Sequence, residues 1–200
     1  MFEKGQVIVI DDFIGKDYQE YIKFQLMGGF DKNNDYQDSQ FPWFYTEDVT
    51  GAGDDDSQHR SAFGHQYVDY EDKSPGHVVS KFNELFTPLL KKVGITLKLY
   101  NINVLQGRSF LQFPILKEKG EPDTPHIDIH DRFHIVALYY VLDSDGDTII
   151  YNERKESKEY TIKQRVSPKQ GLIVIFDGGL YHTAEQPLNN TRCIVNYNIE

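Results

Sequence analysis

Cysteine, basic side chains and long apolar runs are scarce in this chain, and each scarcity excludes a class of protein. Cys193 is the only cysteine among 200 residues, so no disulfide can form within the chain, and we expect a reducing, cytoplasmic location. The amino terminus lacks a basic segment followed by an apolar one, so the sequence predicts no secretion signal. No apolar run approaches the roughly 20 residues that span a bilayer, so we expect no membrane association.

The balance of charge disfavours nucleic acid as a partner. The chain has 21 basic and 31 acidic side chains, which give a formal net charge of −10. An acidic surface repels phosphate backbones, and the sequence contains no run rich in lysine and arginine. The hydrophobic content of 39% is enough for one core, so we predict a single domain over residues 1–200. The sequence does not predict an oligomeric state.

Residues 1–94 predict one short strand and two helices. A β-branched run from Val7 to Phe13 is typical of a strand, and an apolar stripe from Lys16 to Met27 predicts a helix that stops at two glycines. A second helix is expected to begin at Ser74-Pro75, to end at Gly94 and to kink or break at Pro88. Between them, residues 31–73 are polar and hard to interpret. Their aromatic residues are interpreted as core plugs, with a lid over the site as the alternative.

Residues 95–200 predict a series of short strands. Clusters of glycine, proline, aspartate and asparagine separate them, which is typical of a β-sandwich or jelly-roll. We therefore predict a mainly β (α+β) fold with a jelly-roll core over residues 95–200 and with the two helices as buttresses. The strands are expected near 96–105, 108–113, 125–130, 133–142, 147–152, 158–166, 171–177, 180–186 and 191–199.

A histidine and an aspartate two residues apart are the first candidates for chemistry. His126 and Asp128 would leave the same face of an extended strand, and His182 is the candidate third ligand from a distant strand. Two imidazoles and one carboxylate on one face of a metal leave the opposite positions open, as in non-haem Fe(II) oxygenases. A His-x-Asp pair also arises by chance in polar strands. His130 would leave the same strand face as His126 and Asp128. It would therefore line the substrate entrance, or it would lie in a loop exposed to solvent.

Arg192 lies ten residues after His182, in an alternating run rich in β-branched residues. Counting by two from Arg192 puts Ile194, Asn196 and Asn198 on the same face. A buried guanidinium needs a planar anionic partner, and a carboxylate matches its two parallel N–H groups. Arg192 is therefore the candidate anchor of a carboxylate. Asn196 is a candidate contact for the same ligand, as is Thr183, although threonine is also a common strand former.

Together, His-x-Asp, a distal histidine and an arginine ten residues later resemble the 2-oxoglutarate/Fe(II)-dependent dioxygenases. The similarity covers residues 95–200 most strongly and points to small phage and marine bacterial oxygenases of the prolyl 4-hydroxylase-like branch. It implies a double-stranded β-helix, with His126, Asp128 and His182 binding Fe(II). It further implies that Arg192 holds the far carboxylate of 2-oxoglutarate and that Tyr139 donates to it. Tyr140 points to the other face, and a register shift of one residue would exchange the two tyrosines.

The resemblance implies an enzyme that uses Fe(II), 2-oxoglutarate and O₂, with ascorbate as a possible supporting reductant. It would hydroxylate a substrate while decarboxylating 2-oxoglutarate to succinate. A peptidyl proline or another protein side chain is the first candidate substrate, and a small metabolite is the second. Two alternatives remain open. One is a cupin-like metalloenzyme that does not use 2-oxoglutarate, for which Arg192 would have no evident purpose. The other is a non-catalytic jelly-roll that binds a ligand or acts as a scaffold.

Overall fold

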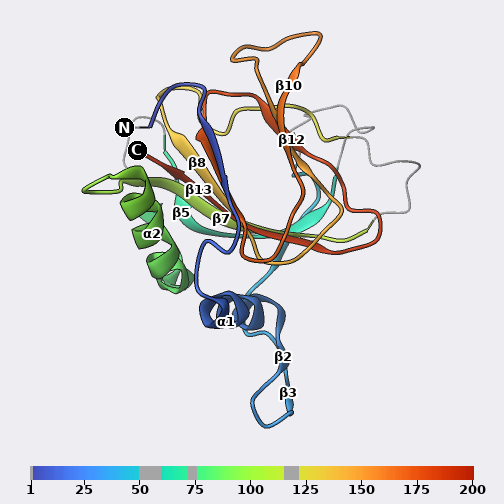
Figure 1. Ribbon diagram of the computed structural model, residues 1–200. Coiled ribbons are helices and arrows are strands. Elements are labelled where there is room, and N and C mark those ends of the chain that lie inside the picture. Colours follow the sequence, from blue (N-terminus) through green and yellow to red (C-terminus); the bar gives the residue numbers. More distant parts are fainter. Residues whose placement is uncertain (1, 50–59, 72–75, 115–121) are drawn as a thin grey trace.

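An antiparallel sheet of eight strands forms the centre of the computed structural model, which describes residues 2–49, 60–71, 76–114 and 122–200 (Figure 1). All of its neighbouring strands run antiparallel. Seven strands lie side by side in the order β1 (Val7–Ile10), β11 (Ile173–Asp177), β8 (Ile135–Tyr140), β13 (Arg192–Ile199), β7 (Val104–Gln112), β5 (Ala62–Asp69) and β4 (Phe44–Thr46), and β6 (His77–Val78) pairs with β5.

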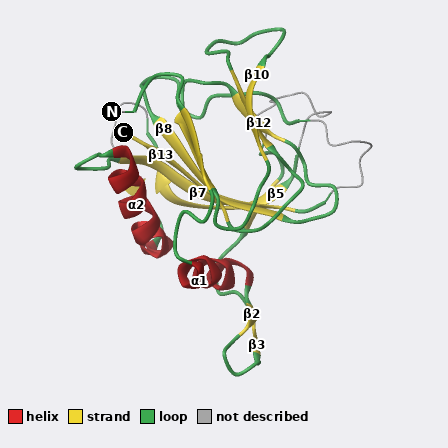
Figure 2. Ribbon diagram, viewed as in Figure 1, coloured by secondary structure: helices red, strands yellow, loops and turns green. Residues whose placement is uncertain are grey.

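A smaller sheet and two helices cover the two faces of this sheet (Figures 1 and 2). The smaller sheet has three strands in the order β10 (Ile162–Val166), β9 (Thr148–Tyr151) and β12 (His182–Ala184). A short ribbon of β2 (Gly29–Phe30) and β3 (Tyr36–Gln37) extends from the far end of α1. The helices are α1 (Lys16–Met27) and α2 (Thr87–Leu97), and a 3₁₀ segment, η2 (Lys81–Phe86), precedes α2. Two β-layers with buttressing helices confirm the predicted jelly-roll fold class.

The central strands β8 and β13 are buried on both faces, which places a core on each side of the large sheet. Tyr139 and Val195 belong to the core that faces α1 and α2. Leu138 and Ile194, each one residue away, point to the opposite core, which also contains Ile150 of the smaller sheet. Successive side chains of a strand leave opposite faces. A shift of one residue along either strand therefore moves a side chain from the core beside the helices to the space between the two sheets.

The first helix has the predicted bounds, whereas the second differs from the prediction at both ends. Pro88 does break the segment, because it lies in the first turn of α2, directly after η2. The chain is extended at His77–Val78, where Val78 pairs with Val68 of β5, and Ser80 caps η2 by accepting a hydrogen bond from the Phe82 N–H. The predicted start, Ser74-Pro75, lies outside the described residues. The helix also runs past Gly94 to Leu97.

Six of the nine predicted strand regions contain the strands β8 to β13, and three predictions need correction. Residues 96–103 form the end of α2 and a turn, and β7 is one continuous strand rather than two. Gly107, which falls between the first two predicted strands, lies within β7, where a Cβ would come within 2.4 Å of the Tyr197 ring. Residues 125–130 form no regular strand. His126 makes an isolated bridge to His182 instead.

The aromatic residues near position 43 divide between the core and the surface. Phe41 is buried, and the indole N–H of Trp43 donates to the carbonyl of Leu26 at 3.0 Å. The prediction of core plugs is therefore confirmed for these two. Phe44 and Tyr45 are instead 61% and 65% exposed. No helix in the described part of the chain is long and apolar enough to cross a membrane.

Candidate metal centre and adjoining cavity

The two candidate histidines are held together by backbone hydrogen bonds. The His126 N–H donates to the carbonyl of His182, and the His182 N–H donates to that of His126, both at 3.0 Å. Each imidazole Nδ1 then lies near a carbonyl: His126 near Thr124 O at 3.1 Å and His182 near Leu180 O at 3.2 Å. With Nδ1–H donated in this way, the lone pair of each ring lies on Nε2.

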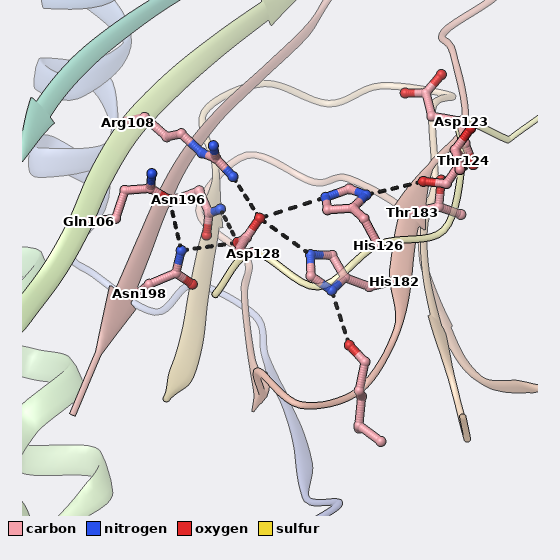
Figure 3. Close-up of polar contacts among 11 residues, drawn as sticks. Gln106, Arg108, Asp123, Thr124, His126, Asp128, His182, Thr183, Asn196 and Asn198 are labelled. Atoms are coloured by element: carbon pink, nitrogen blue, oxygen red, sulfur yellow. Dashed lines mark hydrogen bonds and ion pairs between the residues drawn. The ribbon is translucent and has the colours of Figure 1, made fainter. Parts of the chain in front are cut away.

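Asp128 completes a triad with these two nitrogens (Figure 3). Its Oδ1 is 3.6 Å from His126 Nε2 and 3.9 Å from His182 Nε2. One ligand atom from each of the three side chains lies within 4.8 Å of the others, so the three residues can hold a metal ion. The sequence therefore identified three side chains that the fold brings together, although His126 lies in an isolated bridge and Asp128 at a bend rather than on a regular strand.

Two asparagines of β13 orient the Asp128 carboxylate. Its Oδ2 accepts hydrogen bonds from Asn196 Nδ2 at 3.0 Å and from Asn198 Nδ2 at 3.1 Å (Figure 3). Asn198 also donates to Gln106 of β7 at 3.1 Å. The predicted face of Arg192, Asn196 and Asn198 is thus observed, but the asparagines contact the carboxylate of the candidate metal ligand. They occupy Oδ2 and leave Oδ1 directed at the imidazoles.

Arg108 of β7 is the strongest electrostatic neighbour of the triad, and the sequence analysis missed it. Its Nη2 lies 2.6 Å from Asp128 Oδ1. Burial of Asp128 would raise the pKa of its carboxyl, but the charge of Arg108 and the contact with His126 hold that pKa well below its usual range. Burial lowers the pKa of His182 to about 4. The burial of His126 would lower its pKa too, but hydrogen bonding to Asp128 raises it above its usual value.

Arg192 is buried with only 3% of its surface exposed, and its hydrogen-bond partners are neutral. Its Nε donates to the carbonyl of Gly146 at 3.1 Å, its Nη1 to Gln112 Oε1 at 2.8 Å and its Nη2 to Thr148 Oγ1 at 2.9 Å. Burial lowers the pKa of the guanidinium from its usual value. Among the described residues, no carboxylate lies within 4 Å of this cation. Within the described part of the chain, its charge therefore has no direct counter-ion.

The tyrosine expected beside Arg192 is Tyr140 rather than Tyr139. Tyr139 points into the core against the helices, and its buried hydroxyl has no hydrogen-bond partner among the described residues. The Tyr140 ring lies 6.0 Å from the Arg192 guanidinium, and its hydroxyl donates at 2.7 Å to the same Thr148 oxygen that Arg192 contacts. The prediction for Tyr139 is therefore wrong: the next residue of the strand, Tyr140, faces Arg192 instead.

Asp123, three residues before His126, belongs to a buried ion pair. Arg60 Nε is 3.1 Å from Asp123 Oδ1, and both side chains are less than a tenth exposed. Burial raises the pKa of the Asp123 carboxyl, although Gln186 and Arg60 oppose the shift. Thr183, a predicted ligand contact, donates its hydroxyl to the backbone carbonyl of Asp123. This bond joins the segment before His126 to β12, which carries His182.

Several of these side chains line one cavity, which encloses about 580 Å³ of empty space, part of it open to solvent. The triad, Asp123, Thr183 and Asn196 contribute to its wall together with Arg192 and Arg108. His130 is exposed and lies in a different pocket, beside Arg132 and Arg154, so it does not line this cavity. Two residues of β7 that the sequence did not indicate, Arg108 and Gln112, also line the cavity. They lie four positions apart, on the same face of that strand.

Comparison with known proteins gives no match by sequence and clear matches by structure. No family model matches the chain, and no curated protein matches it either. An oxidoreductase of the 2OG-Fe(II) oxygenase family from Burkholderia pseudomallei superposes with a TM-score of 0.67 at 10% identity, over 97% of this chain and 84% of that one. The chain shares the fold of these oxygenases.

Two further structures of known activity match over nearly the whole chain. The viral collagen prolyl hydroxylase of Paramecium bursaria Chlorella virus-1 gives a TM-score of 0.56 at 13% identity, over 96% of this chain and 94% of that one. The alpha-ketoglutarate-dependent epimerase SnoN from nogalamycin biosynthesis gives a TM-score of 0.60 at 9% identity, over 98% and 79%. One fold thus carries enzymes with a protein substrate and enzymes with a small-molecule substrate.

Proposed function

We propose that this protein is an Fe(II)- and 2-oxoglutarate-dependent dioxygenase that hydroxylates its substrate and converts 2-oxoglutarate to succinate. One observation carries the proposal. The triad and a buried guanidinium that has no counter-ion among the described residues line the same cavity. A metal site alone is compatible with many reactions. A second, buried positive charge in its cavity requires an anionic ligand beside the metal.

The residues have separate tasks in this proposal. His126, Asp128 and His182 would hold the iron, whose chemistry when 2-oxoglutarate and O₂ are bound is the oxidative decarboxylation that drives hydroxylation. Arg192 would hold the far carboxylate of 2-oxoglutarate through N–H groups that the neutral partners Gln112 and Thr148 already orient. Tyr140 supports this group through Thr148.

The donor set fits a divalent iron ion. Both imidazoles present Nε2, because each Nδ1 lies against a backbone carbonyl. Asp128 is held ionised, so it offers a charged oxygen to a cation. Asn196 and Asn198 fix the other oxygen, so the carboxylate is oriented before any metal arrives. Calcium and magnesium prefer oxygen ligands, whereas two of the three ligands in this triad are imidazole nitrogens.

The substrate belongs to one of two classes. The matched structures include a hydroxylase of collagen proline and enzymes of small-molecule biosynthesis. A peptidyl proline, another protein side chain or a small metabolite is therefore the candidate substrate. Ascorbate would support turnover by keeping the iron reduced.

The test combines binding and turnover. Calorimetric titration of 2-oxoglutarate into the Mn(II)-loaded protein measures affinity without catalysis, and succinate formation with Fe(II), ascorbate and O₂ measures turnover. Arg192→Ala should weaken 2-oxoglutarate binding by about 30-fold or more, because the carboxylate loses its charged partner. Arg165→Ala is the matched control, since Arg165 is an exposed arginine outside the cavity.

The alternatives give different results. A cupin-like enzyme would bind Mn(II) but would give a flat titration with 2-oxoglutarate. A binding or scaffold protein would bind neither. Asp128→Ala should abolish Mn(II) binding, and normal metal binding by that variant would contradict the ligand assignment.

A further inference from the structure

A groove on the large sheet continues from the metal cavity and is not used by the metal or 2-oxoglutarate. The two cavities share Arg108, Phe110 and Val49 in their linings. The groove then crosses β7, β5 and β4, where Phe110, Gly64 and Phe44 lie opposite one another in register. A substrate that reaches the triad from solvent along this surface would therefore pass over these three residues.

The groove lining combines apolar Phe44, Val49 and Phe110 with polar side chains such as Thr46 and Gln66, and Gly64 adds no side chain to it. A Cβ at position 64 would lie 3.3 Å from the Phe110 ring, tighter than ordinary packing. Phe44, two strands from Phe110, is 61% exposed. Strands are about 4.8 Å apart, so Phe44 and Phe110 start about two strand spacings apart with no side chain between them. An exposed aromatic residue beside an unfilled floor is typical of a binding surface for an apolar group.

Arg108 stands where the groove meets the triad, and most of its donors are unused. A guanidinium has five N–H donors. Among the described residues, Asp128 is the only hydrogen-bond acceptor of Arg108, and the buried Nε has no partner. The side chain is 25% exposed and lies 5.2 Å from the Phe110 ring. It therefore presents a positive charge and free donors to both cavities.

The balance of charge at the centre also points to an anion. Arg60 and Asp123 neutralise each other, which leaves Arg108, Arg192 and Asp128, a sum of +1. If the proposed function holds, a divalent metal and dianionic 2-oxoglutarate also bind here, and their charges cancel, so the sum stays at +1. Asp48 of the groove accepts a hydrogen bond from the Arg60 backbone N–H and adds one negative charge there. Within the metal cavity, whose lining does not include Asp48, one positive charge remains, and Arg108 carries it to the groove.

We propose that this groove is the binding site of the prime substrate, and that the substrate is an organic carboxylate. Arg108 holds its carboxylate, and its apolar body lies over Gly64 between Phe44 and Phe110. Arg108 is then a specificity residue. It selects an anionic molecule and fixes the end of that molecule beside the metal, so the position that reacts lies a few bonds from the carboxylate.

The test uses matched pairs of probes that differ only in charge. Phenylacetate, 3-phenylpropanoate and 4-phenylbutanoate are each titrated by calorimetry, beside the corresponding amide, into the Mn(II)-loaded protein saturated with 2-oxoglutarate. A doubled 2-oxoglutarate concentration should leave the affinities unchanged, which shows that the probes do not occupy the Arg192 site. At least one carboxylate should bind ten times more tightly than its amide.

Four variants assign the preference to the groove. Arg108→Gln should reduce the preference for the carboxylate to less than twofold, whereas Arg108→Lys should retain part of it. Gly64→Val should weaken the carboxylate and the amide equally, because its side chain fills the floor beside Phe110. Arg165→Gln, on the exposed arginine of β10, should bind the probes as the wild type does. Circular dichroism checks that each variant is folded.

Three results would overturn the inference. They are an equal affinity for every carboxylate and its amide, a preference that survives Arg108→Gln, and tighter binding of phenyl phosphate than of every carboxylate. Failure of the proposed function gives a different result, because the wild type would then not bind 2-oxoglutarate at all. In that event the probes are titrated into the metal-free protein, in which Arg108 and the groove have the geometry described above.

Discussion

Asn196 and Arg192 lie four residues apart on the same face of β13, and they act on opposite ends of one cavity. Asn196 Nδ2 donates to Asp128 Oδ2 at 3.0 Å, while Arg192 presents its guanidinium between Gln112 and Thr148. A single rigid strand therefore sets the distance between the candidate metal ligand and the candidate carboxylate anchor. Strand residues hold such spacing more accurately than loop residues do, and positioning of this kind is a large part of catalysis.

Asn196→Ala should weaken metal binding without removing a metal ligand. The Asp128 carboxylate would lose one of its two orienting amides, and loss of such a partner costs about 10–100-fold in metal affinity. Titration with Mn(II), followed by electron paramagnetic resonance, measures the effect. Asn101→Ala is the control, because Asn101 is an exposed residue outside the cavity. Unchanged affinity in Asn196→Ala would mean that Asn198 alone orients the carboxylate.

The two neighbouring tyrosines should respond differently to loss of their hydroxyl groups. Tyr140→Phe removes the hydrogen bond to Thr148 that supports Arg192. A hydrogen bond of this kind contributes about 0.5–1.5 kcal/mol, so the affinity for 2-oxoglutarate should fall by about two- to tenfold. Tyr139→Phe should leave that affinity unchanged and should keep or raise the free energy of unfolding, because its buried hydroxyl has no partner among the described residues. The opposite order would restore Tyr139 as the residue that supports the anchor.

The exchange of these tyrosines shows where sequence reasoning about the fold loses information. All six residues of β8 are buried, so no alternation of polar and apolar residues indicates which side chains face the helices. In β13, Arg192, Asn196 and Asn198 are polar and their parity is visible, and the prediction for that face was correct. The periodicity of a strand is readable from the sequence wherever one face differs from the other.

Arg108 escaped the sequence analysis for a different reason. It is important because β7 pairs with β13 and puts Arg108 opposite Asn196, 88 positions away in the chain. The sequence around Arg108 does not indicate which residue of β13 will lie opposite it. The second helix was placed wrongly for a similar reason, since pairing of Val78 with Val68 outweighs the local helical pattern. The triad was recognisable because its spacing and residue types match a known chemical arrangement.

Gly107→Ala should destabilise the core between the large sheet and the helices. A Cβ at position 107 would lie 2.4 Å from the ring of Tyr197, a buried residue whose hydroxyl donates to Asn83 at 2.8 Å. Forcing an extra carbon into a packed core typically costs about 1–3 kcal/mol. Urea unfolding measures the difference, with Gly15→Ala as the control because nothing lies within 4 Å of a Cβ there. Equal losses in the two variants would show that the Tyr197 ring moves aside freely.

Asp177 should make the stability of the protein depend on pH in the acidic range. The buried carboxylate at the end of β11 accepts hydrogen bonds from Arg154 and from the backbone N–H groups of Gly5 and Gly179. Its burial alone would raise its pKa, but these donors together hold the pKa below its usual value. A carboxyl with a depressed folded-state pKa stabilises the fold at a pH above its unfolded-state pKa of about 3.9. That contribution is lost as the pH falls through the folded-state pKa.

Asp177→Asn should therefore lower the free energy of unfolding by about 1–3 kcal/mol at pH 7, with the difference from wild type shrinking below about pH 4. Urea unfolding at pH 7, 5 and 3 measures this convergence. Asp35→Asn is the control, because Asp35 is an exposed aspartate near the β2–β3 ribbon. A difference between Asp177→Asn and wild type that stays constant from pH 7 to pH 3 would show that the charge of Asp177 does not contribute. The hydrogen bonds would then act equally well through an amide. A difference that vanishes at low pH would establish the ionised carboxylate as the group that joins the amino terminus, Arg154 and the turn before His182.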